Sequence, residues 1–532
     1  MESPLDTAPE NAGPARDERN DATILACLAL AKLLLHFAVN GRYGYWIDEL
    51  YFIACGEHLA WGYVDHPPLI AAVAQASRAL MGDSLFAIRF FPAVAGALLV
   101  FLTGWLARAL GGGRFAQVLA ATTVIVAPIY LAFNNLLTMN AFEPLLWTAC
   151  AYVVVLIVKN EDPRLWLIVG LIAGIGMLNK HSMAFFGGSV AVGLLLTAQR
   201  RMLWTPWIVA GAVVAFVILL PHLLWQVRLG WPTVELLRNA KLYQHQPVSP
   251  AEFVWGQIQL MHPFTLPIWV AGVYFYLRAR DSRSYRFLGW AFVLLFAAAL
   301  VGQAKTYYLG PIYPTVLAAG AVATEGFANR RRWNWLKPAT LVLLLIGGVV
   351  SAPYVLPVLP IEAVPRYLAI LGMKDVRPER RTEGVIPQLF ADMFAWPETV
   401  AAVARVYHSL SPEDQARCAI WGRSYGETAA VDFFGGAYGL PRAISGYQNY
   451  YLWGPGNTSG DVMITVSIPG ERLARWFDTV ELMDTVPCEY CMPDRMSTPI
   501  YVCRGLKMPL REFWPKVKCW TCDMPEFARG GQ

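Results

Sequence analysis

Residues 41–69 read GRYGYWIDELYFIACGEHLAWGYVDHPPL, and this polar stretch decides how the rest of the chain is organised. An apolar run precedes it and another follows it, so it forms the first exposed loop of a membrane protein. Asp48 and Glu49 stand side by side among aromatic residues, and Asp65 and His66 directly precede two prolines. Adjacent carboxylates beside a membrane suit general-base or metal chemistry at the lipid surface. The alternative is that Asp48 or Glu49 only caps a short helix, because the first helical turn favours acids.

Composition identifies the chain as a polytopic membrane protein. Of its 532 residues, 56% are hydrophobic and 15% are charged, whereas soluble proteins average roughly 25% charged residues. Residues 1–22 are polar and lack the basic segment and short apolar core of a cleavable signal peptide, so we expect a disordered cytoplasmic tail. The sequence contains no Gly-Lys-Ser/Thr phosphate loop, and we expect no nucleic-acid partner.

Residues 23–357 are predicted to form a transmembrane domain of about eleven helices. The apolar runs cover residues 23–40, 86–108, 115–133, 138–158, 165–179, 182–198, 205–225, 259–278, 287–303, 309–328 and 338–357. Lys and Arg gather in alternate connecting loops, as at 330–332, and short loops rich in basic residues stay in the cytoplasm. An odd number of spans then places the N-terminus inside and everything after residue 357 outside.

Residues 358–532 differ in character and are predicted to form an extracytoplasmic α/β domain. The apolar runs become shorter here and charged residues are mixed among them. Alternation at 418–421 and at 462–468 indicates strands, and the pattern over 396–410 indicates a helix.

Six of the nine cysteines lie in this C-terminal domain, and an even number in an oxidising compartment predicts disulfides. Two Cys-x-x-Cys pairs, Cys488 with Cys491 and Cys519 with Cys522, have a spacing that also suits a tetrahedral zinc site. We favour disulfides because the domain is predicted to lie outside the membrane. Zinc stays the alternative, and the sequence does not give the connectivity.

Polar side chains gather at the predicted outer ends of the spans. Basic residues there run against the positive-inside bias, so they need an anionic partner, and the phosphate of a lipid is the natural candidate at that depth. Pairing with Asp or Glu is the alternative for each of them. The residues concerned are Arg89, Asn140, Glu143, Lys180, His181, Lys305 and Tyr308.

Several of these motifs form a familiar combination. In chain order they are Asp48-Glu49 after the first span, Asp65-His66 before Pro67-Pro68, the turn Asn179-Lys180-His181, and the segment KTYYLGPIYP at 305–314. The chain thereby resembles glycosyltransferase family 39, which includes bacterial lipid A aminoarabinose transferases and protein O-mannosyltransferases. The resemblance covers about residues 41–320, the membrane part of the chain.

The resemblance implies a GT-C membrane fold and an inverting sugar transfer from a polyprenyl-phosphate donor. The acceptor would be a glycolipid, a polysaccharide or a protein at the outer face of a bacterial inner membrane, among membrane lipids. Asp48 matches the family's loop carboxylate, which activates or orients the acceptor, and Glu49 adjoins it as a second catalytic candidate. The resemblance places His66, Lys180, Lys305 and Tyr308 at the donor phosphate, and Arg89 joins them as a basic residue at an outer end. The candidates around the substrate are Tyr63, Asp65, Asn140, Glu143 and His181.

Two positions depart from the family pattern. Many relatives carry Lys where this chain has His66, so its phosphate contact would depend on protonation or on a divalent metal held by Asp65 and His66. Asn140 or Glu143 would have to replace an Asp that the family often carries. No other cofactor is expected.

The competing class is a polytopic transporter or lipid flippase, in which buried Lys, His and Glu side chains form a relay. The two classes differ in where the polar side chains lie. A transferase is expected to gather Asp48, His66, Lys180 and Lys305 at one outer site, whereas a transporter would line a path through the bilayer.

Overall fold

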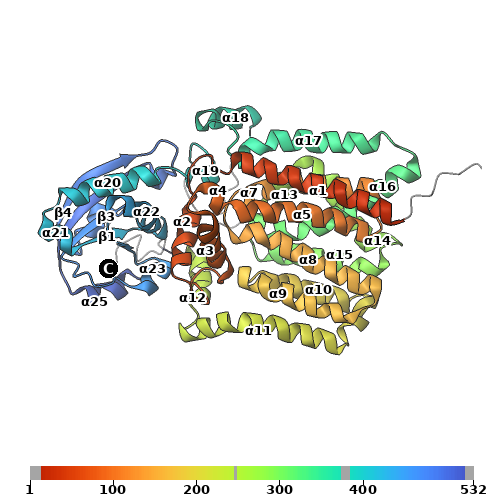
Figure 1. Cartoon of the computed structure of the whole chain (residues 1–532), viewed down its shortest axis with the longest axis horizontal. Coiled ribbons are helices and arrows are strands. Elements are labelled where there is room, and N and C mark those ends of the chain that lie inside the picture. The colour runs from red at the N-terminus through yellow and green to blue at the C-terminus, as the bar shows by residue number, and fades with distance from the viewer. Residues whose placement is uncertain (1–13, 245–247, 373–383, 522–532) are drawn as a thin grey trace, which may run out of the picture.

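The computed structural model describes residues 14–244, 248–372 and 384–521. A bundle of long helices forms one part of the molecule, and a smaller domain containing a β-sheet lies at one end of it (Figure 1). The short helices α2 (Ile47–Glu57) and α3 (Leu69–Met81) lie between the two parts (Figure 1). The loop that carries the paired carboxylates therefore forms the junction.

A helix lies over every apolar run predicted from the sequence. The helices are α1 (Pro14–Val39), α5 (Phe90–Ala109), α6 (Arg114–Val126), α7 (Pro128–Phe133), α8 (Met139–Asn160), α9 (Trp166–Asn179), α10 (Met183–Leu195), α11 (Pro206–Arg228), α13 (Pro250–Met261), α14 (Leu266–Arg278), α15 (Arg286–Val301), α16 (Tyr313–Arg331) and α17 (Leu336–Val355). Among the described residues, six helices are long and apolar enough to cross a bilayer, or seven if the bent pair α13–α14 counts as one span. The total of eleven spans stays a prediction.

The first helix begins earlier than expected. Because α1 starts at Pro14, the predicted disordered tail over 1–22 is wrong for residues 14–22, while residues 1–13 lie outside the described residues. Asp21 accepts hydrogen bonds from Arg108 Nη1 at 3.0 Å and from Arg114 Nε at 2.8 Å. These ion pairs give the polar start of α1 partners at the end of α5 and the start of α6.

Lys32 is fully buried in α1, and its ammonium lies beside a break between helices. The helix α6 ends at Val126 and α7 begins at Pro128, whose ring nitrogen has no hydrogen to continue the ladder. Lys32 Nζ donates to Ile125 O at 3.4 Å and to Tyr130 O at 3.3 Å. The buried amino group of Lys32 thus satisfies carbonyls beside an interrupted helix.

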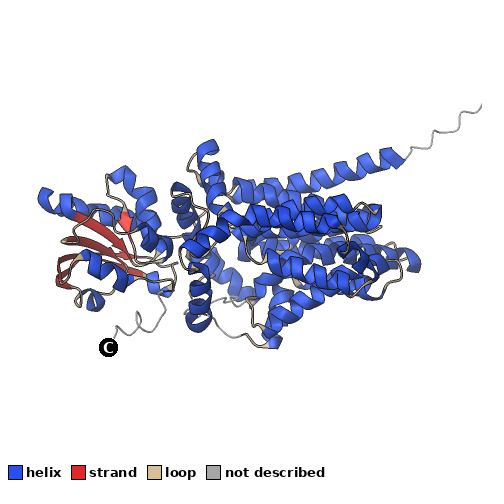
Figure 2. Cartoon of the chain, turned by 90° about the horizontal axis from the view of Figure 1, so that it is seen from below, coloured by secondary structure: helices blue, strands red, loops and turns tan. Residues whose placement is uncertain are grey.

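The C-terminal domain is a five-stranded mixed sheet with helices, which confirms the predicted α/β class (Figure 2). The strand order is β2 (Ala443–Ile444), β1 (Cys418–Gly422), β3 (Val462–Val466), β5 (Ser497–Leu506) and β4 (Phe477–Pro487). The strand β1 is parallel to β2 and β3, and β5 is antiparallel to β3 and β4. All residues of β1 and β3 are buried, as expected for parallel central strands covered on both faces.

The C-terminal domain and the outer loop share one hydrophobic core. Buried residues of α2, such as Leu50 and Ile53, pack in the same cluster as Val400 of α20 (Trp396–Ser409), Ala430 of α22 (Tyr425–Phe434) and Ile464 of β3. Removing the domain would expose this apolar face of α2 to water. The two parts therefore form one folding unit at the junction.

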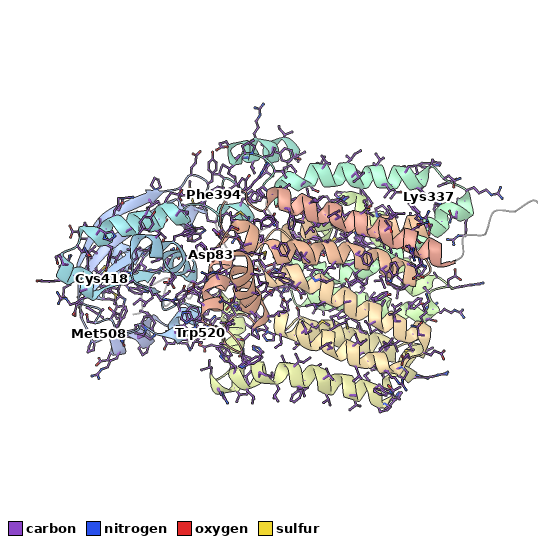
Figure 3. All side chains as sticks on the ribbon, viewed as in Figure 1. Asp83, Lys337, Phe394, Cys418, Met508 and Trp520 are labelled. Carbon is purple, nitrogen blue, oxygen red and sulfur yellow. A yellow bond between two sulfur atoms is a disulfide. The ribbon has the colours of Figure 1, made fainter. Side chains whose placement is uncertain are left out.

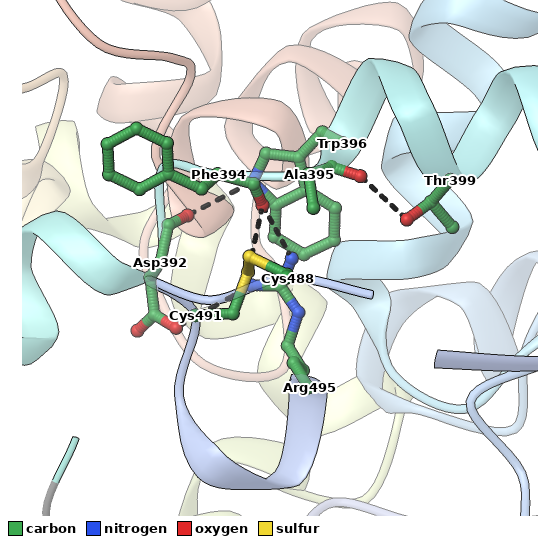
Figure 4. The surroundings of a disulfide bond; sticks show 8 residues. All are labelled: Asp392, Phe394, Ala395, Trp396, Thr399, Cys488, Cys491 and Arg495. Atoms are coloured by element: carbon green, nitrogen blue, oxygen red, sulfur yellow. Dashed lines mark hydrogen bonds and ion pairs between the residues drawn. A yellow bond between two sulfur atoms is a disulfide. The ribbon is translucent and has the colours of Figure 1, made fainter. Parts of the chain in front are cut away.

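The cysteines of the C-terminal domain divide into two kinds. Cys488 and Cys491 form a disulfide (Figure 4), and Cys519 is also disulfide-bonded, whereas Cys522 lies outside the described residues. Cys418 and Cys503 are buried free thiols on β1 and β5, so the expectation that all six cysteines form disulfides is wrong. Their side chains fill the core as small apolar groups.

The disulfide loop is tied to the start of α20. The guanidinium of Arg495 donates to Phe394 O at 2.9 Å and lies 3.6 Å from the centre of the Trp396 ring (Figure 4). Among the described residues, no group of three or more His, Cys, Asp or Glu side chains has the arrangement of a metal site. Of the two predicted alternatives, disulfide and zinc site, Cys488 and Cys491 form the disulfide.

Asp432 makes the stability of the C-terminal domain depend on pH. Its carboxylate accepts hydrogen bonds from Ala443 N at 2.8 Å and from the Tyr450 hydroxyl at 2.9 Å, yet burial raises its pKa from 3.8 to about 6. Because the folded state holds this proton more tightly than the unfolded state does, the stability contribution of Asp432 is greatest below about pH 4 and falls until about pH 6. Over this pH range the contribution of Asp432 to the free energy of unfolding falls by about 3 kcal/mol.

We expect the free energy of unfolding of the wild type, measured in detergent, to fall relative to that of Asp432→Asn between about pH 4 and pH 6. The Asn side chain still offers an acceptor to Ala443 N, but it does not titrate. A difference between the two proteins that stays constant over this pH range would contradict the assignment.

Candidate active site

Glu49 is a structural residue of the outer loop. It lies in the first turn of α2, and its Oε2 accepts a hydrogen bond from Trp46 N at 2.9 Å, so the capping alternative holds for this residue. Glu49 also receives Arg89 Nε at 2.9 Å and Arg89 Nη2 at 2.8 Å, and Leu137 N donates to its Oε1 at 3.0 Å. Both charged side chains are fully buried.

Arg89 extends this network to the end of α1. Its Nη1 donates to Asn40 O at 3.0 Å and its Nη2 donates to Gly44 O at 2.8 Å. The ion pair thus ties three chain segments together behind the outer loop. The predicted roles of Glu49 in catalysis and of Arg89 at a phosphate find no support in this geometry, because both side chains are buried and paired.

Asp48 points the other way, toward the C-terminal domain. Its carboxylate is half-buried and accepts a hydrogen bond from the Tyr425 hydroxyl at 2.7 Å. Tyr425 is the first residue of α22, and its ring lies 4.6 Å from the ring of Tyr51 on α2. The two adjacent acids therefore have different surroundings: one is sealed in the fold and the other lies at the domain junction.

Asp65 is held by donors from both sides of the junction. Tyr51 donates to Asp65 Oδ1 at 2.8 Å, and Asn449 Nδ2 lies 3.4 Å from the same oxygen. Burial and the negative charge of Asp65 raise the pKa of Tyr51, so this hydroxyl keeps its proton and acts as a donor. Within the described part of the chain, Asp65 Oδ2 has no hydrogen-bond partner, and the side chain is 20% exposed.

His66 and Tyr63 support the loop from inside. The His66 ring is fully buried, stacks on Tyr63 with 4.6 Å between centroids, and has Nδ1 2.8 Å from Pro67 O. Its Nε2 lies 3.9 Å from Asp65 Oδ1. The Tyr63 hydroxyl donates to Cys55 O at 2.9 Å. Tyr63 is therefore a scaffold residue, and the buried imidazole does not present itself to a phosphate.

The metal alternative does not fit this loop. Asp65 and His66 supply two donor groups, and His66 Nδ1 is occupied by a carbonyl oxygen. In the described ranges no third His, Cys, Asp or Glu completes a set of ligands here. We therefore assign no step to a metal.

Lys180 forms the centre of a second polar group at the turn between α9 and α10. Its Nζ donates to Asn140 Oδ1 at 2.7 Å and to Glu143 Oε2 at 2.9 Å. The ammonium also lies 5.0 Å from the centre of the Tyr308 ring, within cation–π range. An ammonium has three N–H groups, and the third has no partner among the described residues. The Lys180 side chain is 20% exposed.

Tyr308 belongs to a segment that lies over the Lys180 turn and begins after Lys305. Lys305 caps the 3₁₀ segment η6 (Thr306–Ile312), which carries Tyr308 and Tyr307 over Lys180. Tyr308 is 43% exposed. The segment thus presents an aromatic surface beside the Lys180 turn.

The two polar groups meet at His181. Its Nε2 lies 2.9 Å from His222 Nε2. Burial, together with the nearby His222 and His66, lowers the pKa of His181 to about 4. The outer loop reaches the same histidine pair, because His222 Nδ1 lies 2.9 Å from Trp61 O. A line of contacts thus runs from Asp48 through Tyr425, Tyr51 and Asp65 to His66. Of the predicted residues, Asp48, Asp65, Lys180 and Tyr308 are at least partly exposed, whereas Glu49, His66, Arg89 and Glu143 are buried.

Sequence reasoning did not identify Tyr51, Tyr425 and Asn449. Tyr51 had a local signal, because it lies three positions after Asp48 on one helix and so on the same face. Tyr425 and Asn449 carry no such signal, since they come from a domain more than 370 positions away.

Comparisons with known proteins define the class. Residues 65–225 match the family model described as dolichyl-phosphate-mannose-protein mannosyltransferase. The crystal structure of ArnT from Cupriavidus metallidurans in the apo state superposes with a TM-score of 0.59 over 91% of this chain and 98% of that chain, at 15% identity. The form bound to undecaprenyl phosphate gives the same TM-score. The chain is therefore a polytopic membrane protein with the GT-C glycosyltransferase fold.

Within that class, the predicted resemblance to the aminoarabinose transferases is confirmed by sequence. The undecaprenyl phosphate-alpha-4-amino-4-deoxy-L-arabinose arabinosyl transferase of Yersinia pestis is 26% identical over 291 residues. The corresponding protein of Yersinia enterocolitica is 23% identical over 294 residues. The chain spans about half the length of the curated relatives it matches, 51% and 52% respectively.

Proposed function

We propose that this protein is a membrane glycosyltransferase that moves a sugar from a polyprenyl-phosphate donor to a glycolipid, polysaccharide or protein acceptor. The observation that carries the proposal is the arrangement at the outer end of the bundle. The first loop, which holds the partly exposed Asp48 and Asp65, is linked through His222 and His181 to the turn that carries Lys180. The relatives that match by sequence are named for transfer from undecaprenyl phosphate. A pentose is the favoured sugar on that likeness.

The chemistry needs a base for the acceptor and a cation for the leaving group. Asp48 takes the proton from an acceptor hydroxyl as the hydroxyl oxygen attacks the anomeric carbon. The bond from that carbon to the phosphate oxygen breaks, and the lipid phosphate leaves with the electron pair. Lys180 and Lys305 stabilise the negative charge on the departing phosphate. Asp65 Oδ2 offers a second acceptor for a sugar or acceptor hydroxyl.

The arrangement in the membrane follows from the charges. Predicted inner loops, with Lys337 among them, lie at the end of the bundle farthest from the C-terminal domain (Figure 3). Basic loops stay in the cytoplasm, so the N-terminus lies inside and the C-terminal domain lies at the outer face of a bacterial inner membrane. The polar groups of the site gather at that outer end, which favours a transferase over a transporter.

The direct test uses membranes that contain the chain, supplied with radiolabelled polyprenyl-phosphate sugars. We expect label to move into a lipid, polysaccharide or protein fraction, and to stay on the donor in membranes without the chain. Absence of transfer from every donor, with the folded protein present, would overturn the proposal.

Lys180→Gln is expected to raise the KM for the donor by roughly 10-fold or more, because it removes a charge-assisted contact to phosphate. Kinetics at varied donor concentration measure this effect. Glu143 is 3% exposed and would lose its cationic partner in this variant, although the Ser182 hydroxyl still donates to its Oε1. The single variant has two effects: it removes the phosphate contact and it leaves the charge of Glu143 without a cation. Combining Lys180→Gln with Glu143→Gln removes the second effect. A normal donor KM in this double variant would remove Lys180 from the phosphate site.

A further inference from the structure

The C-terminal domain makes direct polar contacts with two partly exposed carboxylates of the outer loop, Asp48 and Asp65. Tyr425 begins α22 and donates to Asp48 at 2.7 Å. Asn449 belongs to α23 (Gln448–Trp453) and lies 3.4 Å from Asp65 Oδ1. Neither contact involves the membrane helices, so the outer domain reaches into the site itself.

These two side chains are held firmly by their own surroundings. Asn449 is 1% exposed, its Oδ1 accepts from Val64 N at 3.1 Å, and its amide also contacts the Tyr51 hydroxyl. Both the oxygen and the nitrogen of the Asn449 amide therefore have partners, which fixes the orientation of the side chain. The backbone around it is pinned as well, because Gln448 N donates to the carbonyl oxygen of the disulfide-bonded Cys519 at 2.9 Å.

Tyr425 is held by the close approach of two helices. A methyl group added at Gly426 would lie 2.6 Å from Ile47 Cδ1, so α22 sits directly against the start of α2. The Tyr425 ring packs on Tyr51 at 4.6 Å on one side and on Tyr447 at 5.3 Å on the other. The hydroxyl consequently meets Asp48 without freedom to turn away.

We infer that Tyr425 and Asn449 are positioning residues, through which the C-terminal domain fixes the orientation of Asp48 and Asp65 toward the acceptor. This inference rests on the proposed function. A carboxylate that acts as a base must hold one oxygen toward the attacking hydroxyl, and a donor on its other oxygen sets that geometry. At Asp65 the Tyr51 hydroxyl and the Asn449 amide both converge on Oδ1 and leave Oδ2 for a substrate. The domain thus completes the site.

The test compares Tyr425→Phe with Tyr451→Phe in the full-length protein in membranes. Tyr451 is in the same domain and stacks on Trp514, and its hydroxyl has no hydrogen-bond partner in the described ranges. We expect Tyr425→Phe to lower kcat roughly 10-fold, the value of a hydrogen bond to a charged group, without changing the donor KM. Tyr451→Phe is expected to keep the wild-type rate.

A second readout separates positioning from mere structural support. A hydrogen bond to a carboxylate favours its ionised form, so loss of the Tyr425 hydroxyl is expected to move the acid limb of kcat/KM to higher pH. Asn449→Ala is expected to lower kcat in the same way through Asp65. Normal kcat and an unmoved acid limb in Tyr425→Phe would overturn the inference.

A thermal-unfolding cycle with Tyr425→Phe, Asp48→Ala and the double variant tests the contact without reference to activity, because each single variant removes the hydrogen bond. We expect the two single effects to be non-additive. Additive effects would overturn the inference even if the enzyme is active. If the wild type transfers no sugar while the cycle shows coupling, the proposed function fails and the positioning role for transfer fails with it, but the domain contact stands.

Discussion

Asp48→Asn is expected to lower the rate of sugar transfer roughly 1,000-fold, the usual loss when a general base is removed. The carboxylate is half-buried at the domain junction, and the Tyr425 hydroxyl donates to it at 2.7 Å. Asparagine has the same shape and keeps an oxygen that accepts this hydrogen bond, so the fold is expected to persist. The loss is then chemical, because an amide does not take a proton from an acceptor hydroxyl.

The measurement is label transfer in membranes with equal amounts of each protein. Asp83→Asn is a matched control, since Asp83 is also an outer-side aspartate, but it is more than half exposed and pairs with Arg78. We expect the control to keep the wild-type rate. Full activity of Asp48→Asn, with the control also active, would exclude Asp48 as the base and point to Asp65.

The sequence predicts most of the membrane architecture because burial in lipid imposes a simple rule. Every backbone group must be satisfied internally, so an apolar run of sufficient length becomes a helix. Helices occupy all eleven predicted runs, and strands occupy both predicted positions in the C-terminal domain, at 418–422 and 462–466. The runs do not reveal how a break between two helices is stabilised. At the break between α6 and α7, Lys32 of α1 supplies the hydrogen bonds.

The pair Asp48-Glu49 shows that neighbours in the sequence need not belong to the same site. Neighbouring residues on a helix point about 100° apart, so they rarely share surroundings. Glu49 turns inward to Arg89, whereas Asp48 turns to the C-terminal domain. Sequence analysis predicts that the acids of this loop are important, but it does not show which acid is buried and which faces the C-terminal domain.

The outer domain is the other place where the sequence carries no signal. Tyr425 meets Asp48 across 377 positions, and Asn449 meets Asp65 across 384. No local spacing reports such contacts. They arise because α2 and α3 pack into the core of the C-terminal domain. For the same reason, point variants test the domain's part in acceptor choice better than deletion of residues 358–532, which would expose α2.

Glu49→Gln and Arg89→Leu are each expected to lower the free energy of unfolding by about 3–5 kcal/mol, because each leaves a fully buried charge without its partner. Both side chains are fully buried, and together they also bind Trp46 N, Leu137 N, Asn40 O and Gly44 O. The double variant is expected to recover only part of the loss, since these main-chain groups stay unsatisfied. Denaturation in detergent micelles measures all three proteins.

Arg405→Gln is the matched control for this experiment. Its partner is Asp484 at 2.8 Å, but the Arg405 side chain is 66% exposed, so its removal is expected to cost less than about 1 kcal/mol. The same variants decide the role of Glu49. If Glu49→Gln unfolds like the wild type but transfers no sugar, Glu49 acts in catalysis and the structural assignment is wrong. If its activity falls only in proportion to the folded fraction, Glu49 holds the loop so that Asp48 alone serves as the base.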